Sequence, residues 1–171
     1  MKISNIARIR TALLHATALE KASDKNYEKS LADLRKIYKI LGLSAPSAVV
    51  VPDTNMLFSL LSFKLNDFLS SNAAAEIAFH QLSEKKWKYT EEERKYLKYY
   101  CRILLEYCSD NLGGGGRVDE IYAAVNFSSL DFNKVDSRFR RNFPIRQASS
   151  FETNVTPEVH SNRDRTPVRG G

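Results

Sequence analysis

The feature that most constrains the fold is a stretch of sixty residues, from Asp53 to Leu112, that contains neither glycine nor proline. Alternating strands and helices usually leave glycine and proline at the turns that join them. A stretch without either residue favours helices joined by short polar turns. The sequence therefore predicts a mostly α-helical bundle.

Two helices are predicted ahead of this stretch. In residues 4–22, apolar side chains recur three and four positions apart, which predicts a helix whose core face is formed by Ile6, Ile9, Leu13 and Ala16. The second helix ends at Gly42, where a C-terminal glycine belongs. Its core face is predicted to be Tyr27, Leu31, Leu34, Tyr38 and Leu41. We expect this basic pair to pack on the helices that follow.

Within the stretch itself, the pattern predicts a helix from Asp53 to Phe68, a break at residues 70–72 and a continuation to residue 82. Thr90 and Glu93 form a capping box, which predicts the start of a long helix. The core face of this helix is predicted to be Leu97, Tyr100, Cys101, Leu104, Tyr107 and Cys108. The two cysteines lie roughly 10 Å apart along such a helix, too far for a disulfide, which favours a reducing compartment.

Residues 49–61, VVVPDTNMLFSLL, join a β-branched run to a helical apolar pattern. The β-branched residues predict one short extended segment near residues 48–52. Two interpretations of Asp53 follow. In the first, its side chain caps the helix that it precedes, and the protein has no cofactor.

The second interpretation comes from a resemblance. The same thirteen residues resemble the opening of PIN-domain ribonucleases, in which an apolar strand delivers an Asp-Thr-Asn to a metal site. The resemblance implies an α/β fold and a Mg²⁺ or Mn²⁺ ion that generates the hydroxide for RNA cleavage. It implies Asp53 as a metal ligand supported by Thr54 and Asn55. Glu76 and Asp119 are the candidates for further ligands, and Asp53 and Asp119 for catalytic residues.

We predict one helical domain over residues 1–126, comprising a basic helix pair (1–43), a helical core (48–112) and a glycine hinge (113–116). Residues 127–171 are predicted to be a basic, largely disordered tail. Within it, arginine alternates with phenylalanine, a composition typical of a nucleic-acid-binding arm. The candidate contacts are Arg138, Arg140, Arg141 and Arg146, and the alternative is a solvated basic tail.

The net charge of +6 is concentrated at the two ends of the chain. Residues 1–45 carry nine Lys/Arg against four Asp/Glu, whereas residues 46–112 carry eight against nine. No apolar run reaches the roughly 18 residues of a transmembrane helix. We therefore expect a cytoplasmic protein, with the nucleus as the alternative.

Two functions remain open from the sequence. The first is a non-enzymatic helical interaction protein that binds a protein partner, or a second copy of itself, through its helical body and RNA through its basic ends. The alternative is a PIN-like, divalent-metal-dependent ribonuclease, or an inactive relative, centred on Asp53.

Overall fold

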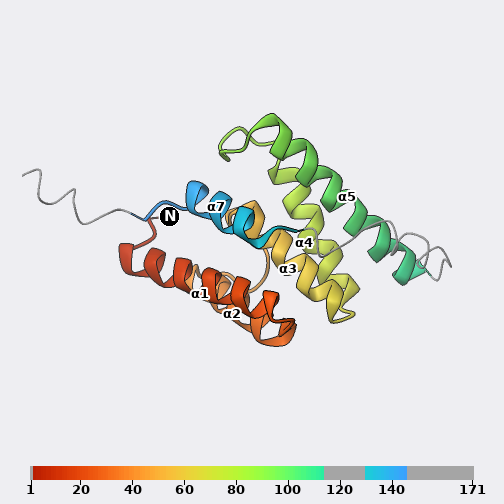
Figure 1. Cartoon of the computed structure of the whole chain (residues 1–171), viewed down its shortest axis with the longest axis horizontal. Coiled ribbons are helices and arrows are strands. Elements are labelled where there is room, and N and C mark those ends of the chain that lie inside the picture. The colour runs from red at the N-terminus through yellow and green to blue at the C-terminus, as the bar shows by residue number, and fades with distance from the viewer. Residues whose placement is uncertain (1, 114–129, 146–171) are drawn as a thin grey trace, which may run out of the picture.

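The computed structural model describes residues 2–113 and 130–145, and within these ranges the chain is helical and contains no strand (Figure 1). The helices of this described part are α1 (Asn5–Ser23), α2 (Tyr27–Ile40), α3 (Pro52–Lys64), α4 (Phe68–Gln81), α5 (Glu91–Gly113) and α7 (Phe132–Asn142). The predicted mostly α-helical fold is confirmed. The α/β alternative is not what these residues adopt.

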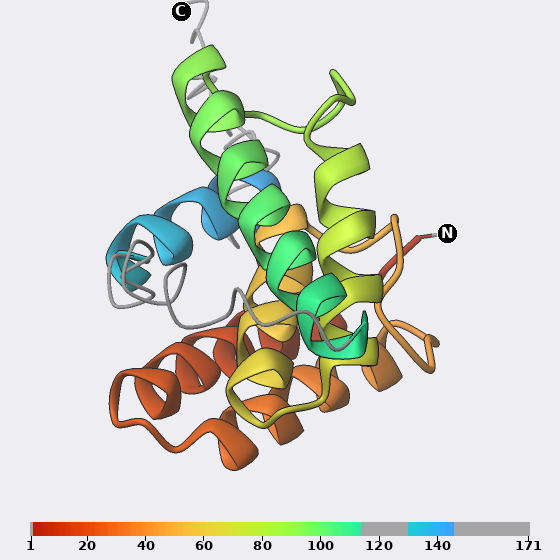
Figure 2. The same ribbon diagram turned by 90° about the vertical axis from the view of Figure 1, so that its right-hand side faces the viewer.

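Helix α3 is the centre of the body. All of its residues from Pro52 to Phe63 are buried. A helix that is buried all round needs neighbours on every side, and α2, α4, α5 and α7 all pack on it. The pairs α1–α2 and α4–α5 lie on different sides of α3, as both views show (Figures 1 and 2).

Helices α2 and α5 follow the sequence closely. The apolar positions of α2 are buried at Leu31, Leu34 and Tyr38, and Gly42 follows the helix with φ of +74°. The capping box at the start of α5 is formed in both directions. The backbone N–H of Glu93 donates to Oγ1 of Thr90 (3.1 Å), and the N–H of Thr90 donates to Oε2 of Glu93 (2.9 Å).

The predicted core face of α5 is also confirmed. All six of its residues are buried: Leu97, Tyr100, Cys101, Leu104, Tyr107 and Cys108. Both cysteines are free thiols, as the spacing predicted.

Helix α7 corrects the predicted domain boundary, which assigned residues 127–171 to a tail. It packs on α1 and α3, with Val135 and Phe139 buried. Asp131 caps it by accepting a hydrogen bond from the N–H of Asn133 (2.9 Å). Residues 130–145 therefore belong to the helical body. Residues 114–116 of the expected hinge, and residues 127–129 and 146–171 of the expected tail, lie outside the described residues.

The predicted extended segment before α3 is a turn and a bend rather than a strand. Val51 has φ −53° and ψ 133°, which agrees with the bias of a residue before proline against the helical region. The backbone carbonyls of Ala48 and Val50 accept hydrogen bonds from the Gln81 side chain on α4 (2.8 and 2.6 Å). A side chain thus satisfies the polar groups that a neighbouring strand would have paired.

The predicted break at residues 70–72 is also misplaced, because those residues lie inside α4. The turn falls at residues 65–67, where Asn66 has a positive φ of 62°. None of the helices in the described part of the chain is both long and apolar enough to cross a membrane.

Candidate functional site

Asp53 lies in the first turn of α3 and is completely buried. Its Oδ1 accepts a hydrogen bond from Nε of Arg138 on α7 (2.9 Å) and forms an ion pair with Nη2 of the same side chain (2.8 Å). Its Oδ2 accepts one from the hydroxyl of Tyr89 (2.7 Å). The residue before the helix is Val51, and no side chain caps it. The prediction that Asp53 caps α3 is therefore wrong: the carboxylate forms a buried ion pair across the fold.

Burial sets the electrostatics of this pair. Desolvation raises the pKa of Asp53 above its ordinary value, while the Arg138 charge and the hydrogen bonds from Arg138 and Tyr89 act to lower it. Burial and the neighbouring carboxylate raise the pKa of Tyr89, so that its hydroxyl stays protonated and can donate. Each oxygen of Asp53 is therefore engaged by a donor.

The residues around Asp53 do not fit a magnesium or manganese site. Both carboxylate oxygens already contact donors, from Arg138 and Tyr89, and the positive charge of Arg138 would repel a divalent cation. Glu76 lies exposed on α4, and Asp119 lies outside the described residues. Among the described residues, no three His, Cys, Asp or Glu side chains are grouped to hold a metal ion. The PIN resemblance stays a sequence prediction without support from these contacts.

The arginines predicted to bind nucleic acid have different surroundings. Arg138 is buried against Asp53. Arg141 donates from both terminal nitrogens to the carboxylate of Glu93 (2.7 and 3.0 Å). Arg140 pairs with Asp136 one turn away, yet its side chain is 73% exposed. Arg146 lies outside the described residues. Two of the three described arginines therefore attach α7 to the body, and RNA binding stays a prediction.

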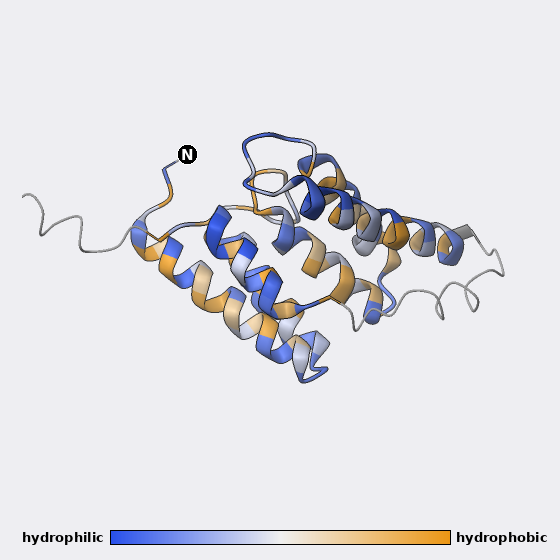
Figure 3. Ribbon diagram, turned by 45° about the horizontal axis from the view of Figure 1, so that its top comes forward, coloured by the Kyte–Doolittle hydropathy of each residue, from blue (hydrophilic) through white to orange (hydrophobic). Residues whose placement is uncertain are grey.

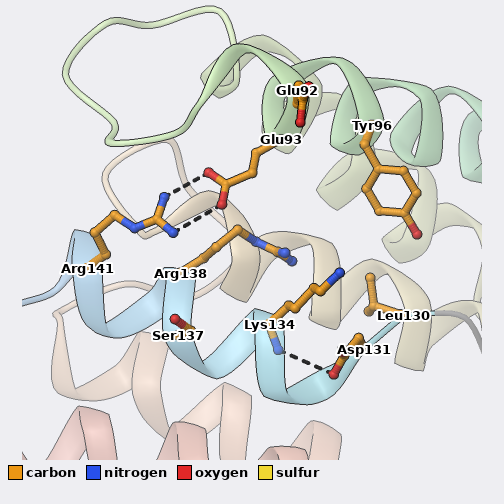
Figure 4. A pocket seen from close by; sticks show the side chains of 9 residues that line it. All are labelled: Glu92, Glu93, Tyr96, Leu130, Asp131, Lys134, Ser137, Arg138 and Arg141. Atoms are coloured by element: carbon orange, nitrogen blue, oxygen red, sulfur yellow. Dashed lines mark hydrogen bonds and ion pairs between the residues drawn. The ribbon is translucent and has the colours of Figure 1, made fainter.

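A cleft of about 390 Å³ lies between α5 and α7, and the ion pair of Glu93 with Arg141 is part of its lining (Figure 4). Its lining combines acids, bases and one aromatic ring: Glu92, Glu93, Tyr96, Leu130, Asp131, Lys134, Ser137, Arg138 and Arg141. Most of these charged side chains already have partners within the protein. Glu93 holds Arg141, Arg138 holds Asp53, and Asp131 caps α7. The cleft is therefore part of the interface through which α7 packs on the body.

The outward ridge of α1 is the second candidate site. Ile6 is 72% exposed, Leu13 is 63% exposed and Ile9 is 39% exposed. We call these three residues the outer stripe. The sequence predicted them to be the core face, and this prediction is wrong. The face of α1 that is buried carries Thr11, His15, Ala18, Leu19 and Ala22.

The reversal has a physical cause. Small and polar residues let α1 approach its neighbours closely: the ring of His15 stacks on Phe139 of α7, with ring centres 3.8 Å apart. On the other side, Ser30 of α2 donates to the backbone carbonyl of Ala18 (2.6 Å). In Figure 3, apolar residues recur along the whole of α1. Because α1 has apolar residues on both faces, spacing alone could not identify the buried one.

A groove of about 540 Å³ lies beside the outer stripe, between α1 and α2. We call it the α1–α2 groove. It is lined by the apolar residues Leu13, Leu14 and Ile40 and by the cations Arg10, Lys36 and Lys39. Sequence reasoning identified these helices as a basic pair but missed the groove, because finding it requires knowing which faces of the helices meet.

Comparison with models of protein families, with curated proteins and with solved structures finds no match to this chain. The site must therefore be interpreted from its own geometry.

Proposed function

We propose that this chain is a non-enzymatic interaction protein that binds a protein partner through α1 of its helical body. The observation that carries the proposal is the outer stripe. Exposed apolar residues scattered singly on a surface are ordinary. Here three large aliphatic side chains, spaced three and four residues apart, share one ridge of one helix.

The contacts of α1 explain why the ridge stays free. Its other faces are already occupied by α2 and α7, whereas the three side chains of the outer stripe are 39–72% exposed. A helix that is apolar on two opposite faces is typical of one buried between partners. Burying an exposed Leu or Ile side chain contributes about 1.5–3 kcal/mol. A partner that covers the stripe would therefore gain substantially from it.

The test places a photo-crosslinking amino acid at Ile6 of the full chain in its native cells. Leu69 on α4 is a matched control position, because it is 71% exposed but stands alone. We expect one dominant crosslinked protein from position 6 and none from position 69. That protein is then purified and its affinity measured by titration calorimetry.

With the purified partner, Leu13→Asp should weaken binding by about 2 kcal/mol, roughly 30-fold in Kd. Leu69→Asp should change Kd by less than about threefold. If position 6 yields no specific crosslink, or if the two aspartate variants weaken binding equally, α1 is not the binding surface.

A further inference from the structure

The α1–α2 groove gives the partner a defined chemistry. Arg10, Lys36 and Lys39 line it together with three aliphatic side chains. No acid is among the described residues that line the groove. Asp33, a buried acid on α2, accepts hydrogen bonds from Lys21 and Thr17. It lies 3.3 Å from Lys36, and these contacts lower its pKa. The charge of Asp33 is thus shared between two lysines, and the groove stays positive.

The apolar part of the surface has helical dimensions. The outer stripe runs from Ile6 to Leu13, which is about 10 Å along α1. A helix that lies in a groove presents side chains at i, i+3, i+4 and i+7, which span the same length. The aliphatic residues of the groove, Leu14 and Ile40, widen this strip on the side of α2.

The charge and shape of the α1–α2 groove argue against three kinds of occupant. A second copy of the chain would bring the same three cations against themselves, which like-charge repulsion opposes. Single-stranded nucleic acid binds by stacking bases on aromatic rings, and the groove lining contains none. A bilayer surface is flat, whereas the cations lie along a concave lining.

We propose that the α1–α2 groove and the outer stripe bind an acidic amphipathic helix. Its aliphatic side chains would cover Ile6, Ile9 and Leu13, and its carboxylates would pair with Arg10, Lys36 and Lys39. This inference rests on the proposed function, since it names the class of partner that α1 receives.

The experiment uses three synthetic helical peptides of about 18 residues with leucine at i, i+3, i+4 and i+7. The positions that flank these leucines on the helix surface carry glutamate, glutamine or lysine. Binding to the full chain is measured by fluorescence anisotropy at about 50 mM and about 500 mM NaCl. We expect the glutamate peptide to bind about tenfold more tightly than the glutamine peptide, and high salt to remove the difference.

The triple variant Arg10→Gln, Lys36→Gln, Lys39→Gln should lose the preference for glutamate and keep its far-ultraviolet circular dichroism. A matched variant removes three exposed charges elsewhere, at Lys85, Lys95 and Arg102, and should keep the preference. Leu13→Ser should weaken binding of both the glutamate and the glutamine peptides.

Several outcomes would overturn the inference. The first is equal affinity of the full chain for the three peptides. The second is a concentration-dependent dimer that Leu13→Asp abolishes. The third is sedimentation of the protein with vesicles of phosphatidylcholine and about 30% phosphatidylserine, lost in the triple variant. A specific crosslink at position 6 to a segment without acidic residues would also overturn it, while leaving the proposed function intact. Absence of any crosslink would instead remove the proposed function.

Discussion

Replacing Arg138 by methionine should strongly destabilise the protein, because it leaves a buried carboxyl without its counter-ion. Methionine keeps the apolar stem of the side chain and removes the charge. Asp53 must then stay charged in apolar surroundings or take up a proton. Protonating a carboxyl of ordinary pKa 3.8 at pH 7.5 costs about 5 kcal/mol. Removing one partner of a buried pair costs about 3–5 kcal/mol, so we expect a loss within that range.

Urea unfolding followed by circular dichroism measures this loss. With an m value of about 2 kcal/mol/M, the midpoint should fall by roughly 1.5–2.5 M. Arg140→Met is the matched control on the same helix, since Arg140 is exposed and its pair with Asp136 spans one turn. The control should change the free energy of unfolding by less than about 0.5 kcal/mol.

The pH dependence gives a second measure. In Arg138→Met, the folded-state pKa of Asp53 lies further above its unfolded value than in the wild type. The folded variant then binds the additional proton, so its deficit relative to the wild type should shrink as pH falls. The difference in free energy of unfolding between the variant and the wild type should shrink by up to about 1.4 kcal/mol per pH unit.

A double variant completes the test. Adding Asp53→Asn to Arg138→Met should restore most of the lost stability, because the neutral amide oxygen can still accept from Tyr89. The reasoning is refuted if Arg138→Met and Arg140→Met have equal midpoints, or if the double variant is no more stable than Arg138→Met.

Three further predictions concern other buried or strained positions. Burial lowers the pKa of His15 from 6.5 to about 3, so below about pH 6.5 the unfolded chain binds a proton that the folded chain does not. The free energy of unfolding should therefore fall toward pH 3 by up to about 1.4 kcal/mol per pH unit. Urea titrations should show that His15→Phe removes this slope. Gly42→Ala should lower the free energy of unfolding by about 1 kcal/mol in thermal melts. Gly42 has φ of +74° and an added Cβ meets no atom within 4 Å, so backbone strain alone causes the loss. An unchanged stability would contradict the left-handed conformation of Gly42. Asn55 forms hydrogen bonds with Tyr38 and Gln81 in the interior (2.7 and 2.8 Å). Asn55→Ala should therefore lower the free energy of unfolding by about 2–3 kcal/mol and speed amide hydrogen exchange at Val50. Unchanged exchange would show that the segment before α3 does not depend on Asn55.

Local chemistry explains what the sequence predicted well. Thr90 with Glu93 and the glycine after α2 act through backbone groups only three or four residues away, so their roles follow from spacing alone. The apolar faces of α2 and α5 were also predictable, because their polar and apolar sides are cleanly separated.

The errors share a different cause, since each depends on tertiary contacts. Helix α7 carries a helical signal in Phe132, Val135 and Phe139, but the surrounding charges hid it. Before Pro52, the backbone carbonyls of Ala48 and Val50 accept hydrogen bonds from the Gln81 side chain of α4 rather than from a neighbouring strand. The two-sided α1 gave no signal of which face is buried.

The candidate site was predicted only in part. The sequence indicated both Asp53 and Arg138, but for separate roles. Asp53 was predicted to be a helix cap or a metal ligand, and Arg138 was predicted to contact nucleic acid. Eighty-five positions separate them, and nothing in the spacing of either segment reveals that they meet. A carboxylate and an arginine that are each exposed in the unfolded chain become partners only when α7 docks.

The separation of this pair has a consequence for biosynthesis. At about 5–20 residues per second, roughly 4–17 seconds pass between synthesis of the aspartate and of its arginine. During that interval the central helix emerges with an uncompensated acid and with one side uncovered. A nascent chain that stalls before residue 138 would therefore expose this acid together with the apolar surface of α3, and should be a preferred substrate for chaperones and proteases.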